Sequence, residues 1–231
     1  MAGACADGVD PRGWHLLAVF VATVLGIILR PMPMGAPAFV AVAFAVVSGT
    51  LTIAEATAGF GSTVVWLVVA AFFIATAFVK TGLGARIAYH FMRLLGKSSL
   101  GLAYGIVATD LVLAPAIPSN TARGGGVIYP VLKSLCLSLG SDSAQGTQGR
   151  IAGFLTFTAY QSVVVTSAMF LTAMAANPLA AELAGQQGIE ITWVRWAVAA
   201  SVPGLLSLLV VPFLIYRLYP LKSPKLQKRP R

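Results

Sequence analysis

The chain has 231 residues, of which 58% are hydrophobic and only 10% are charged. Soluble domains carry about 25% charged residues, so this composition excludes an ordinary soluble domain. Sixteen Lys and Arg against seven Asp and Glu give a net charge of +9. Six of the basic residues lie in the last fifteen positions with no acidic residue among them, so the excess belongs mainly to one tail. We therefore expect no nucleic-acid partner.

Three charge-poor segments near the N-terminus have the length of membrane-spanning helices. They cover residues 14–29, 37–54 and 62–79, and each is sixteen to eighteen residues long. Crossing the hydrocarbon core takes roughly 17 to 25 residues, so we predict three spanning helices here.

A helix of a different kind is predicted over residues 82–96. Apolar residues recur there at helical spacing, and basic residues take other positions in and around the segment. The apolar positions are Leu83, Ile87, Phe91, Leu94 and Leu95, and the basic ones are Lys80, Arg86, His90, Arg93 and Lys97. This amphipathic pattern is typical of a helix that lies in the membrane interface.

The apolar region 98–139 is broken near its centre. Residues 114–126 contain two prolines, three consecutive polar residues and three glycines, and we expect that they cannot continue a helix. Non-helical backbone at membrane depth is tolerated where other protein groups or a water-filled cavity form hydrogen bonds with its N–H and C=O groups. We predict a re-entrant helical hairpin with its tip near the middle of the membrane. Two full spans would leave the same charge distribution, but the Pro and Gly content favours the hairpin.

The C-terminal part predicts a discontinuous helix and a last span. Residues 151–184 are interrupted at Asn177–Pro178, where Asn177 could cap a new helix and Pro178 could be its first residue. Residues 192–216 supply the last span. With the basic segments 80–97 and 220–231 inside, five of the seven acidic residues fall outside and five crossings result. They are Asp7, Asp10, Glu55, Glu182 and Glu190. The expected fold is an all-α polytopic membrane protein with one membrane domain, 1–219, and a basic cytoplasmic tail, 220–231.

Ser119, Asn120 and Thr121 stand where one predicted helical arm ends and the next begins. Two hydroxyls and an amide can donate to a carboxylate or accept from a cation. The free N–H groups at the start of the second arm favour an anion, and carbonyls freed by Pro115 and Pro118 suit a hard cation such as sodium. The alternative is a simple N-cap after a helix that ends at proline.

Two ionisable residues lie within the predicted hairpin, Asp110 and Arg123. A charged side chain at this depth in the membrane has a high free-energy cost, so each of these residues marks a candidate functional site. Arg123 could counter a substrate carboxylate, stabilise the hairpin by pairing with Asp110, or extend towards the interface. Three roles therefore stay open for it.

An enzymatic function is not indicated. His15 and His90 are far from Ser119 in the sequence, and no nucleophile and base form a recognisable pair. There is no HExxH motif and no cluster of carboxylates, so we expect no transition metal and no cofactor apart from a sodium ion. The four tryptophans fall near the ends of the predicted spans and are typical of interface anchors.

Three motifs occur together and in order: KTGLGARIAY at 80–89, APAIPSNTAR at 114–123 and SAMFLTAMAANPL at 167–179. With them the chain resembles the divalent anion/sodium symporter family, and within it the bacterial citrate/succinate carriers and the plastid 2-oxoglutarate/malate translocators. The resemblance implies a substrate site that includes Ser119, Asn120, Thr121 and Asn177. It also implies a sodium site formed by Ser119 and Asn120 with Thr172, Ala173 and Met174.

The family pattern has a second inverted repeat with its own Ser-Asn-Thr hairpin, which this sequence lacks. The resemblance therefore implies one repeat, the N-terminal half of a carrier for di- or tricarboxylates such as malate, 2-oxoglutarate, succinate or citrate. Exchange and sodium symport both stay open. Expected partners are the lipid membrane and either a second transporter half or another copy, in a bacterial inner membrane or a plastid inner envelope. The alternative is a truncated membrane protein or scaffold that does not transport.

Overall fold

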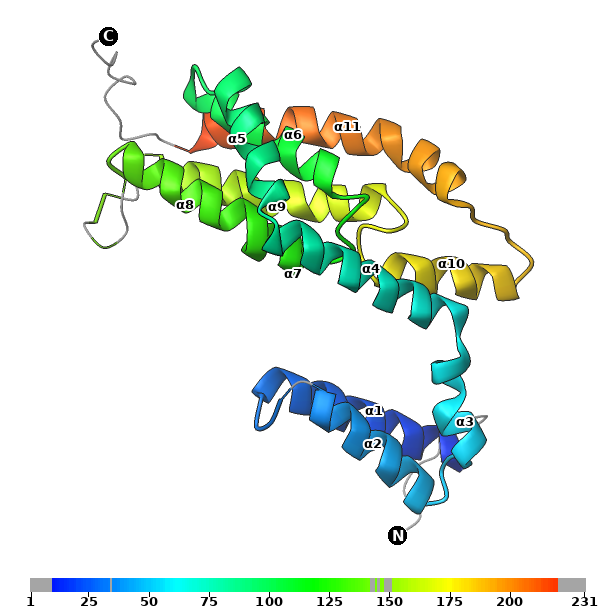
Figure 1. Ribbon diagram of the computed structural model, residues 1–231. Helices are drawn as coiled ribbons and strands as arrows, with labels where there is room; N and C mark the ends of the chain where they lie inside the picture. The colour runs from blue at the N-terminus through cyan, green and yellow to red at the C-terminus, as the bar shows by residue number, and fades with distance from the viewer. Residues whose placement is uncertain (1–9, 34, 142–143, 145, 148–150, 220–231) are drawn as a thin grey trace. The chain divides into compact units, whose positions relative to one another are not determined.

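The computed structural model describes residues 10–33, 35–141, 144, 146–147 and 151–219 (Figure 1). All regular structure within these residues is helical. Three of the helices are long and apolar enough to cross a membrane, namely α1 (Pro11–Leu29), α4 (Thr63–Lys80) and α11 (Trp193–Leu218). They match three of the five predicted spans, and the all-α membrane fold is confirmed. The predicted basic tail, 220–231, lies outside the described residues.

The second predicted span is shorter than expected. Helix α2 covers Gly35–Val47, and the chain turns at Gly49, whose φ of 69° places it in the left-handed region that favours glycine. The short helix α3 (Ile53–Thr57) then begins with a capping box between Thr52 and Glu55. Hydrogen bonds from the Thr52 backbone and hydroxyl to this carboxylate hold the pKa of Glu55 below its ordinary value. Residues 51–54, which were predicted to end the second span, therefore lie at the start of α3.

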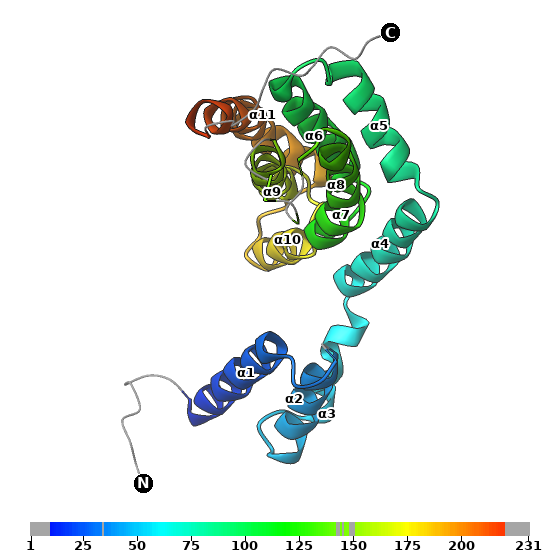
Figure 2. The ribbon, with the colours of Figure 1, turned by 90° about the vertical axis from the view of Figure 1, so that its left-hand side faces the viewer.

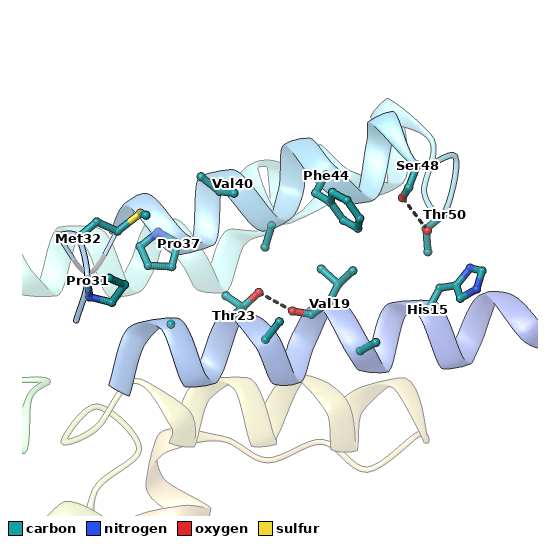
Figure 3. A pocket seen from close by; sticks show the side chains of 14 residues that line it. His15, Val19, Thr23, Pro31, Met32, Pro37, Val40, Phe44, Ser48 and Thr50 are labelled. Carbon is teal, nitrogen blue, oxygen red and sulfur yellow. Dashed lines mark hydrogen bonds between the residues drawn. The ribbon is translucent and has the colours of Figure 1, made fainter. Parts of the chain in front are cut away.

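The chain forms two compact units, Met1–Val65 and Trp66–Arg231. In the first unit, α1 and α2 pack together and leave an open, mainly apolar groove of about 670 Å³ between them (Figure 3). Figure 3 shows Val19 and Thr23 of α1 across from Val40 and Phe44 of α2, with His15, Ser48 and Thr50 at one end. None of the predicted site residues lines this groove.

Helix α9 (Ala152–Met169) is the centre of the second unit. It packs against α6 (Ser99–Leu113), α8 (Tyr129–Ser138) and α11, and Figure 2 shows it flanked by these helices. The main core contains side chains from all four, together with Met92 from α5 (Leu83–Leu95). The deepest aromatic residue is Phe154, which is fully buried and meets the ring of Tyr216 edge-on at 5.7 Å.

Truncating Phe154 tests this core. We expect Phe154→Ala to lower the free energy of unfolding by about 2 kcal/mol, which is the cavity term alone: roughly 100 Å³ of lost volume at about 24 cal/mol per Å³. The transfer term is small because the unfolded chain stays in apolar detergent. Phe157 lies on the same helix but is 49% exposed, so Phe157→Ala should cost less than about 0.5 kcal/mol. Unfolding of the detergent-purified chain in sodium dodecyl sulfate measures both, and equal losses would contradict this packing.

The amphipathic helix predicted over 82–96 is present as α5 (Leu83–Leu95). Its buried side consists of Gly84, Ala88 and Met92, which pack towards α6 and the segment Gly124–Ile128. A Cβ atom at Gly84 would come within 2.8 Å of the Val127 side chain, so this close approach requires glycine.

One prediction for the hairpin region is wrong. The run Gly124–Ile128 does not break the helix but forms a π-helical turn, η2, that joins α7 (Asn120–Arg123) to α8. Only residues 114–119 interrupt the helical arms. A glycine costs a helix about 1 kcal/mol, whereas an unsatisfied backbone group in hydrocarbon costs several. The helical path is therefore favoured despite three glycines.

Candidate functional site

Two non-helical segments, 114–119 and 170–175, lie in direct contact. The first joins α6 to α7, and the second joins α9 to α10 (Ala176–Gln186). The Thr172 hydroxyl donates to the Pro115 carbonyl at 2.9 Å. Nη1 of Arg123 donates to the carbonyls of Ile117 and Ala173, at 3.0 and 3.1 Å. The two interruptions therefore meet, and the second one falls earlier than the predicted break at Asn177–Pro178.

A buried ion pair holds this junction together. Nε of Arg123 lies 2.7 Å from Oδ1 of Asp110, and both side chains are fully buried. Nη2 of Arg123 donates to the hydroxyls of Ser167 and Thr166, at 2.8 and 3.2 Å. The Thr166 hydroxyl in turn donates to the other oxygen of Asp110. A buried charge of this kind is tolerated because it is both paired with an opposite charge and hydrogen-bonded.

These contacts give Arg123 a structural role. A guanidinium has five N–H donors, and here they point at a carboxylate, two hydroxyls and backbone carbonyls. The side chain is fully buried, so it does not extend towards the interface. In this structure Arg123 therefore stabilises the hairpin, and its role as a counter-charge to a substrate carboxylate stays a prediction.

The Ser-Asn-Thr tip begins the second arm. The Ser119 hydroxyl accepts from the backbone N–H of Ala122 at 3.1 Å and caps α7. Oδ1 of Asn120 accepts from the backbone N–H of Thr121 at 2.8 Å. Thr121 is exposed, and Asn120 is half-buried. The capping role proposed as the alternative for Ser119 is therefore present, and the next two side chains stand at the surface of the unit.

Asn120 and Thr121 line an open groove of about 400 Å³ between the second arm and α9. The backbone at Gly124 and Gly125 forms part of its floor, and the remaining lining side chains are mostly apolar or aromatic. They are Ile128, Tyr129, Leu132, Thr156, Ala159, Tyr160, Val163 and Val164. Among the predicted site residues, the described structure brings only Asn120 and Thr121 to this groove.

Asn177 has a different place from the one predicted. Its amide nitrogen donates to the carbonyls of Ser167 and Phe170 at 2.8 and 2.9 Å, and the residue is buried. It does not cap α10, because the N-cap is Ala175 and Asn177 lies inside the first turn. Helix ends leave carbonyls without intrahelical donors. Asn177 supplies such donors at the end of α9 and so stabilises the interruption.

The predicted sodium ligands of segment 170–175 also have protein partners. The Ala173 carbonyl accepts from Arg123, and the Met174 carbonyl accepts from the Asn177 backbone N–H at 3.1 Å. The Thr172 hydroxyl accepts from the Trp193 indole at 3.2 Å while it donates to Pro115. A carbonyl has two lone pairs, so each can accept a second contact.

Several contributors were missed from the sequence. Trp193 stacks on Phe170 with ring centres 5.9 Å apart, and the Trp196 indole donates to the Ala168 carbonyl at 2.9 Å. These two tryptophans therefore hold the end of α9, a role that the prediction of interface anchors did not include. Their spacing of three residues, which places them on one helix face, is the signal that could have indicated a shared role.

The amino-acid sequence matches one protein family over nearly its whole length. The sequence-family model that describes the sodium:sulfate symporter transmembrane region matches residues 4–230. The chain belongs to this family. The resemblance to the divalent anion/sodium symporters is thereby confirmed, and the sodium:sulfate symporter family is one of membrane transporters and not of enzymes. The chain is accordingly an integral membrane protein of a carrier family.

Relatives in this symporter family come from bacteria and plants. The putative malate transporter YflS of Bacillus subtilis is 52% identical over 97% of the chain, and this match covers 46% of the relative. The chloroplastic dicarboxylate transporter 1 of Arabidopsis thaliana is 52% identical over 93% of the chain, or 39% of its own length. The inner membrane protein YbhI of Escherichia coli is 38% identical over 96% of the chain, or 48% of its own length. The chain thus spans less than half the length of these relatives.

Proposed function

We propose that the chain forms one half of a carrier for di- or tricarboxylates, of the malate, 2-oxoglutarate, succinate or citrate class. The observation that carries this proposal is the junction of two interrupted helices beside a groove that presents Asn120 and Thr121. Discontinuous helices that meet in this way are a recurring means of building substrate sites in transporters. Relatives named as malate and dicarboxylate transporters support the substrate class.

The tip is suited to a carboxylate. The second arm runs helically from Asn120 to Ser138, so its first N–H groups and its positive dipole end lie at Asn120 and Thr121. An amide and a hydroxyl there can add directed donors. We assign Asn120 and Thr121 direct contact with the substrate, Ser119 the positioning of the tip, and Asn177 an indirect role through segment 170–175.

The partner in this proposal is a second transporter half. The groove beside Asn120 is open along one side, and its walls carry exposed aromatic side chains, Tyr129 at 52% and Tyr160 at 67%. A dicarboxylate has two charged ends, and a single hairpin tip supplies donors for one. A second half with its own tip would complete the site, and another copy of this chain is the alternative partner.

Sodium is the proposed coupling ion. The Ser119 and Thr172 hydroxyls, the Asn120 amide oxygen and the Ala173 and Met174 carbonyls are hard oxygen donors. Uptake by symport should rise with external sodium and stop when choline replaces it. Equal uptake in both salts would overturn sodium coupling and leave exchange of one carboxylate for another as the mode of transport.

The substrate assignment predicts a loss of transport for Asn120→Ala. A hydrogen bond to a charged group contributes about 1.5–3 kcal/mol, so uptake at low substrate concentration should fall roughly 10- to 150-fold. Labelled malate uptake is measured in liposomes that contain the chain together with the unmatched remainder of the B. subtilis relative. Ser138→Ala is the matched control, because Ser138 lies at the far end of the same helical arm and its exposed hydroxyl bonds only to Leu135.

Unchanged uptake by Asn120→Ala would refute the substrate site. Uptake by the 231-residue chain without any added half would refute the need for a second half. A chain that assembles with the added half but supports no uptake of malate, 2-oxoglutarate, succinate or citrate would favour the non-transporting scaffold.

A further inference from the structure

Helix α5 has two opposite faces of different chemistry. Gly84, Ala88 and Met92 are buried against the rest of the unit. Arg86 and His90 each follow one of these buried residues by two positions, which is about 200° around a helix. Arg93 continues the same stripe at the next helical spacing, and all three basic residues are exposed. The basic stripe therefore points directly away from the packed side.

No acidic residue neutralises this stripe locally. Residues 80–97 contain five basic side chains, if His90 is counted, and no Asp or Glu. The ion pair recorded among the described residues is Asp110–Arg123, which is buried elsewhere. The stripe is thus a concentrated positive surface whose charges are not neutralised by an ion pair among the described residues.

Exposed apolar side chains flank the basic stripe. Leu94 is 62% exposed, Tyr89 is 55% exposed and Leu83 is 42% exposed. Basic residues bordered by leucine and tyrosine are suited to the boundary between headgroups and acyl chains, where the apolar groups enter the lipid and the charges stay at the surface. An acidic protein surface would match the charges but would leave these apolar flanks without a complementary environment.

We propose that the basic stripe of α5, formed by Arg86, His90 and Arg93, binds the headgroups of anionic phospholipids. The charge complementarity is direct, and basic residues next to a membrane are typical of recognition of anionic lipids. Because α5 packs on α6 and on the π-turn η2, headgroup binding fixes the depth of the two arms that carry the Ser-Asn-Thr tip. The lipid therefore stabilises the unit that contains the candidate site, whether or not the substrate assignment is correct.

The test measures the melting temperature of the detergent-purified chain during titration with dioleoylphosphatidylglycerol. Dioleoylphosphatidylcholine and glycerol phosphate serve as separate arms, because they distinguish an anionic headgroup on a lipid from lipid alone and from a free phosphate. We expect phosphatidylglycerol alone to raise the melting temperature. The double variant Arg86→Gln/Arg93→Gln should weaken its apparent affinity by roughly 30-fold, at about fivefold per charge.

The control is Arg12→Gln/Arg195→Gln, which removes the same charge from exposed residues outside α5 and should retain the affinity. Raising salt to 1 M should weaken binding by the native chain, since it shortens the screening length to about 3 Å. Equal effects of the two lipids, an equal effect of glycerol phosphate, or an equal loss in both double variants would overturn the proposal. A melting temperature of the α5 variant in phosphatidylcholine that matches the native chain excludes misfolding as the cause.

Discussion

Asp110→Asn is expected to lower the free energy of unfolding by about 3–5 kcal/mol, because it leaves the buried guanidinium of Arg123 without its counter-charge. The asparagine carbonyl can still accept from Nε of Arg123, so the shape and one hydrogen bond are retained. The loss therefore reports the charge and not the volume. Equilibrium unfolding of the detergent-purified chain in sodium dodecyl sulfate measures it.

A second variant separates a broken ion pair from a general defect. Asp110→Asn/Arg123→Met removes both charges and leaves a shorter, unbranched apolar side chain in the core. We expect this double variant to recover part of the stability lost by Asp110→Asn, since replacing a whole buried pair with apolar groups is often nearly neutral. The contacts of Arg123 to Ile117 and Ala173 are lost, so recovery should be incomplete. A double variant less stable than Asp110→Asn would contradict the assigned pairing.

Asn177→Leu is expected to destabilise the junction by about 2–6 kcal/mol, or about 1–3 kcal/mol for each carbonyl left without its donor. The two carbonyls are those of Ser167 and Phe170 at the end of α9. Leucine has a similar size and retains the backbone N–H that bonds to Met174, so the expected loss comes from the amide. Unfolding free energy and amide hydrogen exchange across 170–175 measure the effect.

Asn120→Leu provides the matched control for that experiment. Among the residues that the structure describes, the Asn120 side chain accepts hydrogen bonds only from the adjacent Thr121, and Asn120 is half-buried at the groove. Its replacement should change the unfolding free energy by less than about 0.5 kcal/mol and leave exchange across 170–175 unchanged. A comparable loss in the two leucine variants would show that the Asn177 amide has no special role.

The helices and their interruptions were largely predictable, because hydropathy, proline and capping residues act locally. The amphipathic segment 82–96 is found as α5, and the discontinuous helix is found as α9 and α10. The errors have physical causes that extend beyond the local sequence. Glycines 124–126 stay helical because backbone at membrane depth must satisfy its polar groups, and α2 ends early because Gly49 takes a left-handed turn.

The candidate site was predictable only in part. The motif at 119–121 identifies the tip, and the structure brings Asn120 and Thr121 to a groove. Four residues of the junction were missed from the sequence, because small polar residues and tryptophans occur widely in apolar helices. They are Thr166, Ser167, Trp193 and Trp196. Their roles depend on partners that lie in other helices.

By itself, the sequence determined that this is an all-α membrane protein of a symporter family, with two interrupted helices and a Ser-Asn-Thr tip. Those features follow from composition and short motifs, which neighbouring residues are sufficient to specify. Only the tertiary structure decided that Arg123 binds Asp110 and the Ala173 carbonyl, fifty residues away, and that Asn177 supports α9 from inside α10. A side chain with several donors can bind many different acceptors. Only the packing of α6, α7 and α9 brings these particular acceptors within hydrogen-bonding distance.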